Sequence, residues 1–502
     1  MARVTIKFDV ISVFPEFFHV LELSLVGKAQ ERGLISVQTH DLRDWAHDVH
    51  RTVDDSPFGG GAGMVMKPDV WGAAIDAVIG PYAHPALPDG EGVSLHMEEN
   101  FSRSEQAPVV LAIPTPSGAP LTQTLCERLA RTPGQIVIAC GRYEGIDARV
   151  AEYYSALPHV QVVEYSLGDY VLNGGEIAAV ALIEAVSRLV PGMVGNPESL
   201  VEESHGAAGL LEYPVFTRPL TFRGLSAPQV LTSGNHGAVT RWRKDRALER
   251  TAQRRPDMLM HLSTHTLDKK DRATLAQLGY LVGKQHNGEA ESQLTRVLLR
   301  QAQPNEVHEL SALAARTFPD AAPAYIAAAD IQAYIQQHLQ PQNFAELLAD
   351  SSHNLLTVVE LCDRAGAPTG KLAGYTWVVV PEGAEVAGAA EGAPVEFVTA
   401  DGVRREGPLL YLEKVYLDRR WRGSGLFDEL MNATLRQLRA LLQKRVPVPR
   451  EPYIWLGTNG SNKRAQRAYR RVGFERSGER TFYVGEQINN DLTMCRRLDM
   501  AQ

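Results

Sequence analysis

The sequence predicts a multidomain α/β protein, because strand-like and helix-like runs alternate along most of the chain. Short β-rich apolar runs at 6–14, 108–113 and 135–141 end at proline or glycine signals. A helical run over 174–190 opens on two glycines and closes on a Pro-Gly pair. Strands that alternate with helices favour a parallel sheet with helices on both faces.

A second β/α pattern begins near residue 294. It is interrupted over 381–407 by a Gly-, Ala- and Glu-rich stretch that is typical of a surface insertion. Two polar, turn-rich stretches separate the patterned parts of the chain. The expected organisation is a first α/β domain over 1–195, a linker over 196–208, a small helical domain over 209–282, a linker over 283–293 and a mixed α/β domain over 294–502.

Composition fits a soluble protein of a reducing compartment. The 502 residues are 44% hydrophobic and 22% charged, which is ordinary for globular proteins. The four cysteines form no C-x-x-C pair, and such usage is common where thiols stay reduced. The longest apolar run, 177–190, carries Glu184 and Arg188 and is too short to span a bilayer. We therefore expect a cytoplasmic protein without a membrane partner.

Basic residues gather in one segment, although the net charge of the whole chain is −8. The run RWRKDRALERTAQRR, residues 241–255, holds seven of them. On a helix, Arg243, Arg246, Arg250 and Arg254 fall near i, i+3, i+7 and i+11 and share one face. Such a face can hold RNA phosphates without reading sequence. The alternative is a solvated charged helix.

Four glycine-bearing segments are candidates for a ligand site. They are residues 50–64, 115–118, 140–145 and 166–176. Loops that follow the carboxyl ends of parallel strands are where α/β sheets bind ligands, and glycine lets a backbone approach closely. None of the segments reads G-x-G-x-x-G, so a Rossmann dinucleotide site is not indicated. Each segment taken alone is also consistent with a plain turn.

Taken together, these segments resemble one family. The motifs run in the order HRTVDD…GGGAGM, TPSG, CGRYEGID, SLGDYVLNGGE, EAVSR, TRP, SGNH and RWR. From about residue 1 to about residue 262, this order resembles the bacterial tRNA (guanine-N1) methyltransferases of the SPOUT class. The resemblance implies a trefoil-knotted α/β domain, a helical tRNA-binding domain, and a homodimer with its site at the subunit interface.

The same resemblance implies a reaction and its cofactor. A methyl group passes from S-adenosylmethionine to N1 of the tRNA guanine next to the anticodon, position 37. Magnesium (Mg2+) dependence is also implied, although no side-chain cluster in the sequence has the pattern of an octahedral site. The loops expected to hold S-adenosylmethionine contain Pro116, Gly118, Gly141, Tyr143, Glu144, Tyr170, Leu172, Gly174 and Gly175.

Two further residues match the catalytic positions of the family. Arg188 matches its arginine, and the alternative is a last-turn arginine that pairs with Glu184. Glu203 stands where the family usually has a linker aspartate. It keeps the carboxylate and adds one methylene, so we expect it to be the general base that takes the N1 proton. The alternative is an acidic, solvated linker.

Two motifs mark the C-terminal part. RRWRGSG, residues 419–425, follows a strand-like run and opens a helix with one apolar face. Backbone N–H groups at such a helix start suit a pyrophosphate. Residues 462–474 read NKRAQRAYRRVGF. The two motifs resemble the GNAT acetyltransferases over about residues 294–498.

The GNAT resemblance implies acetyl-CoA as the acetyl donor. Its contacts would come from Arg420, Gly423, Gly425 and Asn462. Tyr469 matches the residue that often protonates the departing thiolate, and the alternative is an aromatic that packs near Phe474. Glu413 is a weak candidate for deprotonating an amine.

The sequence does not specify the acetyl acceptor, the tRNA species or any coupling between the two halves. Two other functions stay open. The first is a SPOUT methyltransferase that acts on another RNA site. The second is mainly an acetyltransferase, whose N-terminal half only targets RNA.

Overall fold

The computed structural model describes most of the chain. The described residues are 6–80, 109–131, 134–194, 203–206, 208–284, 294–320, 326–381, 397–398, 404–405, 409–445, 452–484 and 487–500. They fall into two compact units, residues 1–206 and 207–502. Most of both predicted linkers and of the surface insertion lies outside the described residues, so the five-part division stays a prediction.

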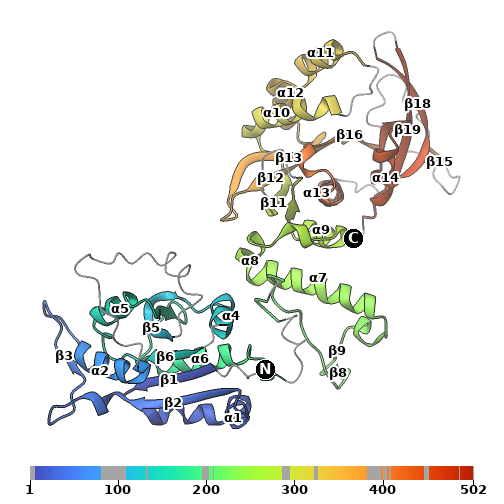
Figure 1. The fold of residues 1–502 in the computed structure, drawn as a ribbon. Coiled ribbons are helices and arrows are strands. Elements are labelled where there is room, and N and C mark those ends of the chain that lie inside the picture. Colours follow the sequence, from blue (N-terminus) through green and yellow to red (C-terminus); the bar gives the residue numbers. More distant parts are fainter. Residues whose placement is uncertain are drawn as a thin grey trace. The chain divides into compact units, whose positions relative to one another are not determined.

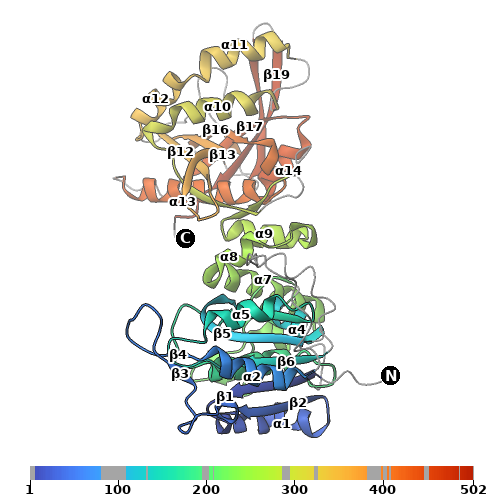
Figure 2. The same ribbon diagram turned by 60° about the vertical axis from the view of Figure 1, so that its left-hand side comes forward.

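The first unit is built on a five-stranded parallel sheet in the order β2-β1-β6-β5-β7 (Figures 1 and 2). The parallel sheet predicted from the sequence is therefore confirmed. Its strands are β1 (Ile6–Ser12), β2 (Ile35–Asp41), β5 (Val109–Pro120), β6 (Gln135–Ala139) and β7 (Val160–Ser166). Its other elements are η1 (Pro15–Glu22), α1 (Ser24–Glu31), η2 (Leu42–Trp45), β3 (Asp54–Asp55), β4 (Val65–Met66), α2 (Pro68–Ile79), α4 (Gln123–Arg131), α5 (Ala148–Ser155) and α6 (Glu176–Ser187).

Helices cover both faces of this sheet because the side chains of β1 alternate between two apolar cores. Phe8 and Val10 join a core that α1, α4 and α6 complete. Ile11 joins a second core formed with Trp71 of α2 and Tyr154 of α5. The sheet is thus buried on both sides, as expected for parallel strands.

The second unit contains an eight-stranded sheet in the order β10-β11-β12-β13-β16-β17-β19-β18. Its strands are β10 (Tyr280–Val282), β11 (Leu294–Gln301), β12 (Asn354–Cys362), β13 (Pro368–Val379), β16 (Leu409–Leu417), β17 (Tyr453–Asn459), β18 (Glu475–Val484) and β19 (Gln487–Arg497). Neighbours pair antiparallel except β16 and β17, which pair parallel. The short strands are β8 (Thr221–Phe222), β9 (Leu225–Ser226), β14 (Phe397–Val398) and β15 (Arg404–Arg405).

Helices lie on both faces of the second sheet as well (Figure 1). The helices of the second unit are α7 (His236–Arg254), α8 (Pro256–Met260), α9 (Lys269–Gln277), α10 (Val307–Thr317), α11 (Ala328–His338), α12 (Pro341–Ala349), α13 (Leu426–Gln443) and α14 (Lys463–Arg471). The short turns are η6 (Gln229–Thr232), η7 (Thr264–Thr266), η8 (Pro304–Glu306), η9 (Phe318–Asp320) and η10 (Arg419–Trp421). Helices α10, α11 and α12 pack on one face, and α13 packs on the other.

The helical segment that precedes the predicted linker at 283–293 shares its last strand with the second sheet. Helices α7, α8 and α9 enclose a small apolar core with Leu248 and Leu259 at its centre, and Tyr280 and Val282 of β10 belong to it. β10 then pairs antiparallel with β11. Sequence reasoning missed this strand, because three residues carry too little periodicity to be recognised.

All four cysteines are buried and free. Within the part of the chain that the structure describes, every helix is too short or too polar to cross a membrane.

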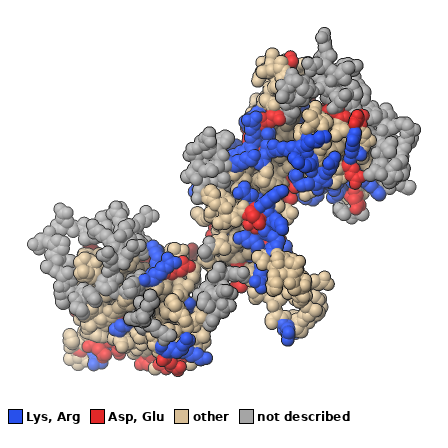
Figure 3. Space-filling model, turned by 45° about the vertical axis from the view of Figure 1, so that its right-hand side comes forward, with Lys and Arg blue, Asp and Glu red and all other residues tan. Residues whose placement is uncertain are grey.

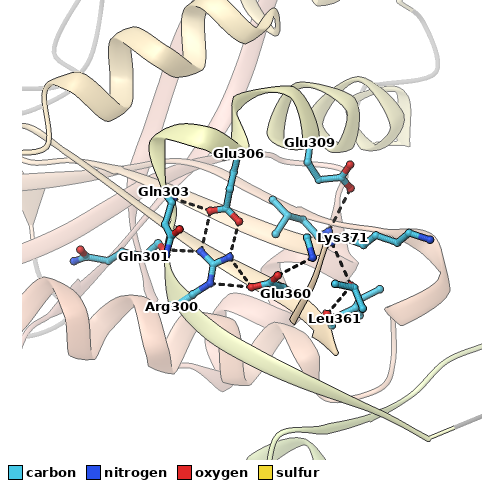
Figure 4. Close-up of polar contacts among 11 residues, drawn as sticks. Arg300, Gln301, Gln303, Glu306, Glu309, Glu360, Leu361 and Lys371 are labelled. Carbon is cyan, nitrogen blue, oxygen red and sulfur yellow. Dashed lines mark hydrogen bonds and ion pairs between the residues drawn. The ribbon is translucent and has the colours of Figure 1, made fainter. Parts of the chain in front are cut away.

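A buried ionic network joins three elements of the second unit (Figure 4). Arg300 of β11 donates to both carboxylate oxygens of Glu306, at 2.5 and 2.8 Å, and to Glu360 of β12 at 2.6 and 3.0 Å. The two carboxylates also accept backbone N–H bonds from Gln303 and Gly370. Burial alone would raise the pKa of Glu306, but the hydrogen bonds from Arg300 and Gln303, together with the charge of Arg300, outweigh burial and lower that pKa.

Replacing Arg300 by Met should therefore destabilise the second unit by about 3–5 kcal/mol at neutral pH, because two carboxylates stay buried without their cation. Because the folded-state pKa of Glu306 is lowered, its ion pair stabilises the fold at pH values above the unfolded-state pKa of Glu306. This stabilisation is lost as the pH falls through the folded-state pKa. In Arg300→Met the pKa of Glu306 loses this lowering, so the deficit should shrink as pH falls and Glu306 takes up a proton. Denaturant unfolding at pH 7 and pH 4.5 measures this, with Arg364→Met at an exposed turn as the control. An equal deficit at both pH values would contradict it.

Candidate functional site

A cavity of about 510 Å³ lies in the first unit, walled by a loop within β5 and by the loops that follow β6 and β7. Such loops lie at the carboxyl edge of a parallel sheet, the usual ligand position in α/β folds. The structure brings together there eight of the nine residues predicted to hold S-adenosylmethionine: Pro116, Gly141, Tyr143, Glu144, Tyr170, Leu172, Gly174 and Gly175. The ninth, Gly118, is not among the lining residues.

The TPSG segment enters the cavity wall as an excursion within β5. Tyr165 of β7 pairs with both Pro114 and Ala119, so the four residues between them are looped out of the ladder. Gly118 closes this excursion against β7. A Cβ on Gly118 would lie 2.5 Å from the Tyr165 backbone nitrogen and 2.7 Å from the Glu164 carbonyl carbon. Only glycine fits this close approach of two backbones.

The start of α6 is packed just as closely. A Cβ on Gly175 would lie 2.7 Å from Cγ of Pro114 and 3.0 Å from Cα of Cys140. The Gly175 N–H donates to the Gly141 carbonyl at 2.9 Å. The segment of β5 next to its loop and the loops after β6 and β7 therefore touch one another through small residues and backbone atoms.

A buried carboxylate holds these loops together. Glu176, the first residue of α6, is 1% exposed. It accepts a hydrogen bond from the Ser12 hydroxyl at 2.8 Å and ion-pairs with Arg142 at 3.0 Å. Arg142 in turn lies 4.6 Å over the Phe14 ring. Sequence reasoning quoted Glu176 and Arg142 only as parts of motifs. A charged residue directly after two glycines at a helix start was the available signal.

The glycine-rich segment at 50–64 reaches the same loops. The Glu144 N–H donates to the Met64 carbonyl, and the Met66 N–H donates to the Gly145 carbonyl, each at 3.0 Å. Gly63 lies against the Glu144 side chain, which would be 2.3 Å from a Cβ at that position. This segment therefore supports the wall of the cavity from outside its lining.

Arg188 and Glu203, the two predicted catalytic residues, are paired. The Arg188 Nη2 atom donates to the Glu203 Oε1 atom at 2.5 Å. Their side chains are 42% and 33% exposed, so both can still reach a ligand. Neither is among the residues that line the 510 Å³ cavity. The backbone carbonyl of Glu184, the alternative partner of Arg188, accepts a hydrogen bond from the Arg188 backbone N–H.

The predicted RNA-facing helix forms as α7, with the Asn235 side chain as its N-cap. Its arginines divide into two groups. Arg241 pairs with Asp271 of α9 at 2.7 Å, and Arg246 pairs with Glu249 at 2.5 Å. Arg250 and Arg254 have no ion pair to a described residue. Arg243 lies 4.9 Å over the Tyr213 ring.

In the second unit, the RRWRGSG loop turns sharply into α13. Gly423 and Gly425 adopt φ of 91° and 93°, which glycine tolerates best. Their N–H groups meet no acceptor among the described residues. Arg422 pairs with Asp320 at 2.7 Å, and the Arg420 guanidinium lies 5.3 Å over the Trp421 ring.

The two central strands beside this loop diverge. Only Leu409–Tyr411 of β16 pair with Tyr453–Trp455 of β17. Beyond these residues, β16 pairs only with β13 and β17 pairs only with β19. Asn462 is the N-cap of α14, and its Oδ1 accepts the Ala465 N–H at 3.0 Å.

Tyr469 packs edge-on to Phe427 and Phe474, with ring centroids 5.5 and 5.9 Å away. Burial first, then Tyr416 and Tyr411, raise the pKa of Tyr469. Its hydroxyl therefore stays protonated at neutral pH, as a general acid requires.

A second cavity, of about 300 Å³, lies between helices α11 and α12 and strands β13 and β16. Glu413 and Lys414 line it and pair with each other at 2.9 Å. Burial would lower the pKa of Lys414, but its interactions with Glu413, Tyr416 and Tyr334 together outweigh burial and raise that pKa. Glu413 is thus engaged by a cation, which weakens its case as a base. The Tyr375 hydroxyl also belongs to this wall and has no hydrogen-bond partner among the described residues.

The described residues contain no group of three or more His, Cys, Asp or Glu side chains that could hold a metal ion. The donor set for the implied Mg2+ is therefore missing from them, and we route no step through a metal.

Comparisons with known proteins agree with both resemblances. Residues 6–261 match the family described as tRNA (Guanine-1)-methyltransferase TrmD, and residues 335–474 match the Acetyltransferase (GNAT) family. A tRNA (guanine-N(1)-)-methyltransferase of Kineococcus radiotolerans is 51% identical over 276 residues, which cover 55% of this chain and 91% of the relative. One of Cutibacterium acnes is 53% identical over 254 residues, which cover 50% of this chain and 96% of the relative.

Both families expected from the motifs are confirmed. The chain therefore belongs to the tRNA (guanine-1)-methyltransferase family through residues 6–261 and carries a C-terminal domain of the GNAT acetyltransferase family.

Proposed function

We propose that this protein transfers a methyl group from S-adenosylmethionine to N1 of the tRNA guanine that follows the anticodon. The observation that carries the proposal is the Arg188–Glu203 pair, because it offers a donor and an acceptor side by side. Guanine presents the complementary pattern, with the O6 acceptor next to the N1–H donor. The relatives' printed name, tRNA (guanine-N(1)-)-methyltransferase, describes the same chemistry.

The 510 Å³ cavity fits the cofactor. Its size lies in the range of sites for drug-sized ligands. Backbone groups of Gly141, Gly174 and Gly175 line it, together with the exposed rings of Tyr143 and Tyr170. S-adenosylmethionine, when bound, supplies a methyl group whose bond to sulfur breaks as the bond to N1 forms.

The chain's own residues prepare the nucleophile. Guanine N1 carries a proton and attacks poorly until that proton leaves. The Glu203 carboxylate accepts it as general base. Negative charge then spreads from N1 to O6, where an N–H group of the Arg188 guanidinium stabilises it. The Arg188–Glu203 hydrogen bond fixes both side chains before the guanine arrives, so less orientational freedom is lost when the guanine binds.

The cavity and the Arg188–Glu203 pair would meet in a homodimer. Support comes from exposed apolar side chains around η1 and α1, which a monomer rarely presents together. They are Phe14, Phe17, Val20, Leu23 and Leu25. Helix α6 packs against η1 and exposes Ile177 on its first turn. A second copy that covers this surface could bring its own Arg188 and Glu203 to the cavity. The trefoil knot and the cytoplasmic location remain part of the same proposal, and the four free cysteines suit a reducing compartment.

Replacing Glu203 by Gln should lower the rate of methyl transfer at least 100-fold, since a positioned base contributes about that much. Affinity for S-adenosylmethionine should stay near that of the wild type, because Glu203 does not line the cavity. Single-turnover transfer to tRNA transcripts with G or A after the anticodon gives the rate, and nucleoside analysis gives the product. The matched control is Glu184→Gln on α6, which removes the other carboxylate near Arg188. Unchanged turnover in Glu203→Gln would remove Glu203 from the mechanism.

Replacing Gly118 by Ala should weaken cofactor binding and lower thermal stability, although Gly118 does not itself line the cavity. The new methyl group must push the backbone of β7 by overpacking, at a cost of about 1–3 kcal/mol. Gly72→Ala in α2 is the control, because a Cβ there meets no atom within 4 Å. Calorimetric titration with S-adenosylmethionine measures the affinity, and thermal unfolding measures the stability. Equal affinities in the two variants would show that the close contact is not required.

For the C-terminal domain, the proposal is acetyl transfer from acetyl-CoA to an amine. The free N–H groups of Gly423 and Gly425 at the start of α13 fit its pyrophosphate. The divergence of β16 from β17 leaves backbone groups for its pantetheine arm, with Asn462 and Tyr469 beyond it. In this proposal Tyr469 returns a proton to the departing thiolate.

Replacing Tyr469 by Phe should reduce acetyl transfer by about 10- to 100-fold while leaving thermal stability within about 1 kcal/mol, since the ring contacts with Phe427 and Phe474 remain. Thiol release from acetyl-CoA with a pool of amines measures the rate. Phe427→Leu, which alters the packing and keeps the hydroxyl, is the companion variant. If it lost activity and Tyr469→Phe did not, Tyr469 would be a packing residue only.

A further inference from the structure

Helix α14 presents an unusually basic face. Its nine residues include five cations and no acidic residue: Lys463, Arg464, Arg467, Arg470 and Arg471. All five are exposed. The opposite face is anchored by Gln466, which is 3% exposed, and by the packing of Tyr469. Figure 3 shows Lys and Arg side chains gathered across the visible face of the second unit.

Most of these cations are not neutralised within the protein. Arg471 pairs with Asp428 of α13 at 2.8 Å. Lys463, Arg464, Arg467 and Arg470 have no ion pair to any described residue. By contrast, Arg241 and Arg300 of the same unit each contact at least two carboxylates. Four uncompensated cations on one short helix create a positive potential that favours a polyanion.

Further cations extend the surface at the C-terminal end of α14. Arg496 of β19 donates to the carbonyl of Val472, directly after the helix. Arg439 of α13 lies close enough to Arg496 to lower its pKa, after the larger effect of burial. The Arg439 Nε atom is buried and has no hydrogen-bond partner among the described residues. Neither Arg439 nor Arg496 has an ion pair to a carboxylate among the described residues, so cations from α13 and β19 adjoin the end of α14.

We propose that the exposed face of α14, with Arg439 and Arg496 at its end, is an RNA-binding surface of the acetyltransferase domain. Arginine dominates it, and the guanidinium fork matches phosphate oxygens in pairs. The helix is about 13 Å long at 1.5 Å per residue, which is enough to follow a phosphate backbone rather than one isolated phosphate. RNA is favoured over an acidic protein because residues 6–261 of this chain belong to a tRNA methyltransferase family. The choice of tRNA as the RNA rests on the proposed function, whereas the binding of RNA by this surface does not.

The test compares two double variants of the full chain that lose the same charge. Arg467→Gln/Arg470→Gln removes two cations of the surface. Arg364→Gln/Lys371→Gln removes two exposed cations, one in the turn between β12 and β13 and one in β13. Binding of a tRNA transcript is measured by fluorescence anisotropy over a series of KCl concentrations, and circular dichroism checks the fold.

The α14 variant should bind tRNA about tenfold more weakly at low salt, and its log–log salt slope should be shallower by about 1–2, the value for one or two lost phosphate contacts. The control should match the wild type. Equal affinity and slope in the wild type and the α14 variant would overturn the inference. It would also be overturned if acetyl-CoA binding fell while tRNA binding stayed, because the cations would then serve the cofactor. If the α14 substitutions weakened the binding of poly-glutamate more than the binding of tRNA, the occupant would be an acidic polypeptide and not RNA.

Methyl transfer at saturating tRNA separates this inference from the proposed function. The rate in the α14 variant should equal that of the wild type, since no α14 residue takes part in the methyl-transfer site. A wild-type protein that transferred no methyl group but bound tRNA through α14 would sink the proposed function and leave this inference standing.

Discussion

The cavity of the first unit depends on one buried ion pair, between Glu176 and Arg142. A carboxylate that is 1% exposed is costly unless it is paired and hydrogen-bonded. Arg142 and the Ser12 hydroxyl supply those partners. They come from the loop after β6 and the end of β1, while Glu176 opens α6. Loss of Arg142 would leave an unpaired buried charge, and loss of Ser12 would remove a hydrogen bond from it, so the three elements are held in one arrangement. The glycine contacts of the cavity wall require that arrangement.

The sequence was sufficient for three strands of the parallel sheet of the first unit and for its ligand loops. Short β-rich apolar runs with Pro or Gly stops located β1, β5 and β6, and the glycines at 174 and 175 marked the start of α6. Strands β2 and β7 were not located from the sequence. The sequence did not predict that residues 115–118 loop out of their strand. Their looping out is set by the double pairing of Tyr165, which lies about 50 residues away in the chain. Pairings of this kind leave no local pattern in a single sequence.

Arg188 and Glu203 likewise show the difference between what a local motif predicts and what depends on contacts between distant residues. The family motifs pointed to both residues, and the structure adds a direct contact between them. Motif position alone could not have given that contact, because it depends on how the chain after α6 returns to the helix end. In the second unit, β10 was missed for a related reason. Its three residues are recognisable as a strand only once β11 is beside them.

The arginines of the second unit show why a charge run is a poor guide until its partners are known. Arg241 and Arg246 lie in the most basic segment of the sequence, yet both are paired with carboxylates, and Arg241 serves to hold α7 on α9. An arginine so engaged has little left for a phosphate, because its fork is already filled. Among the residues that the structure describes, the only carboxylate paired with α14 is Asp428, beside Arg471. Uncompensated cations cost the fold some repulsion and gain it no packing, so their persistence on one helix face points to an anion outside the chain.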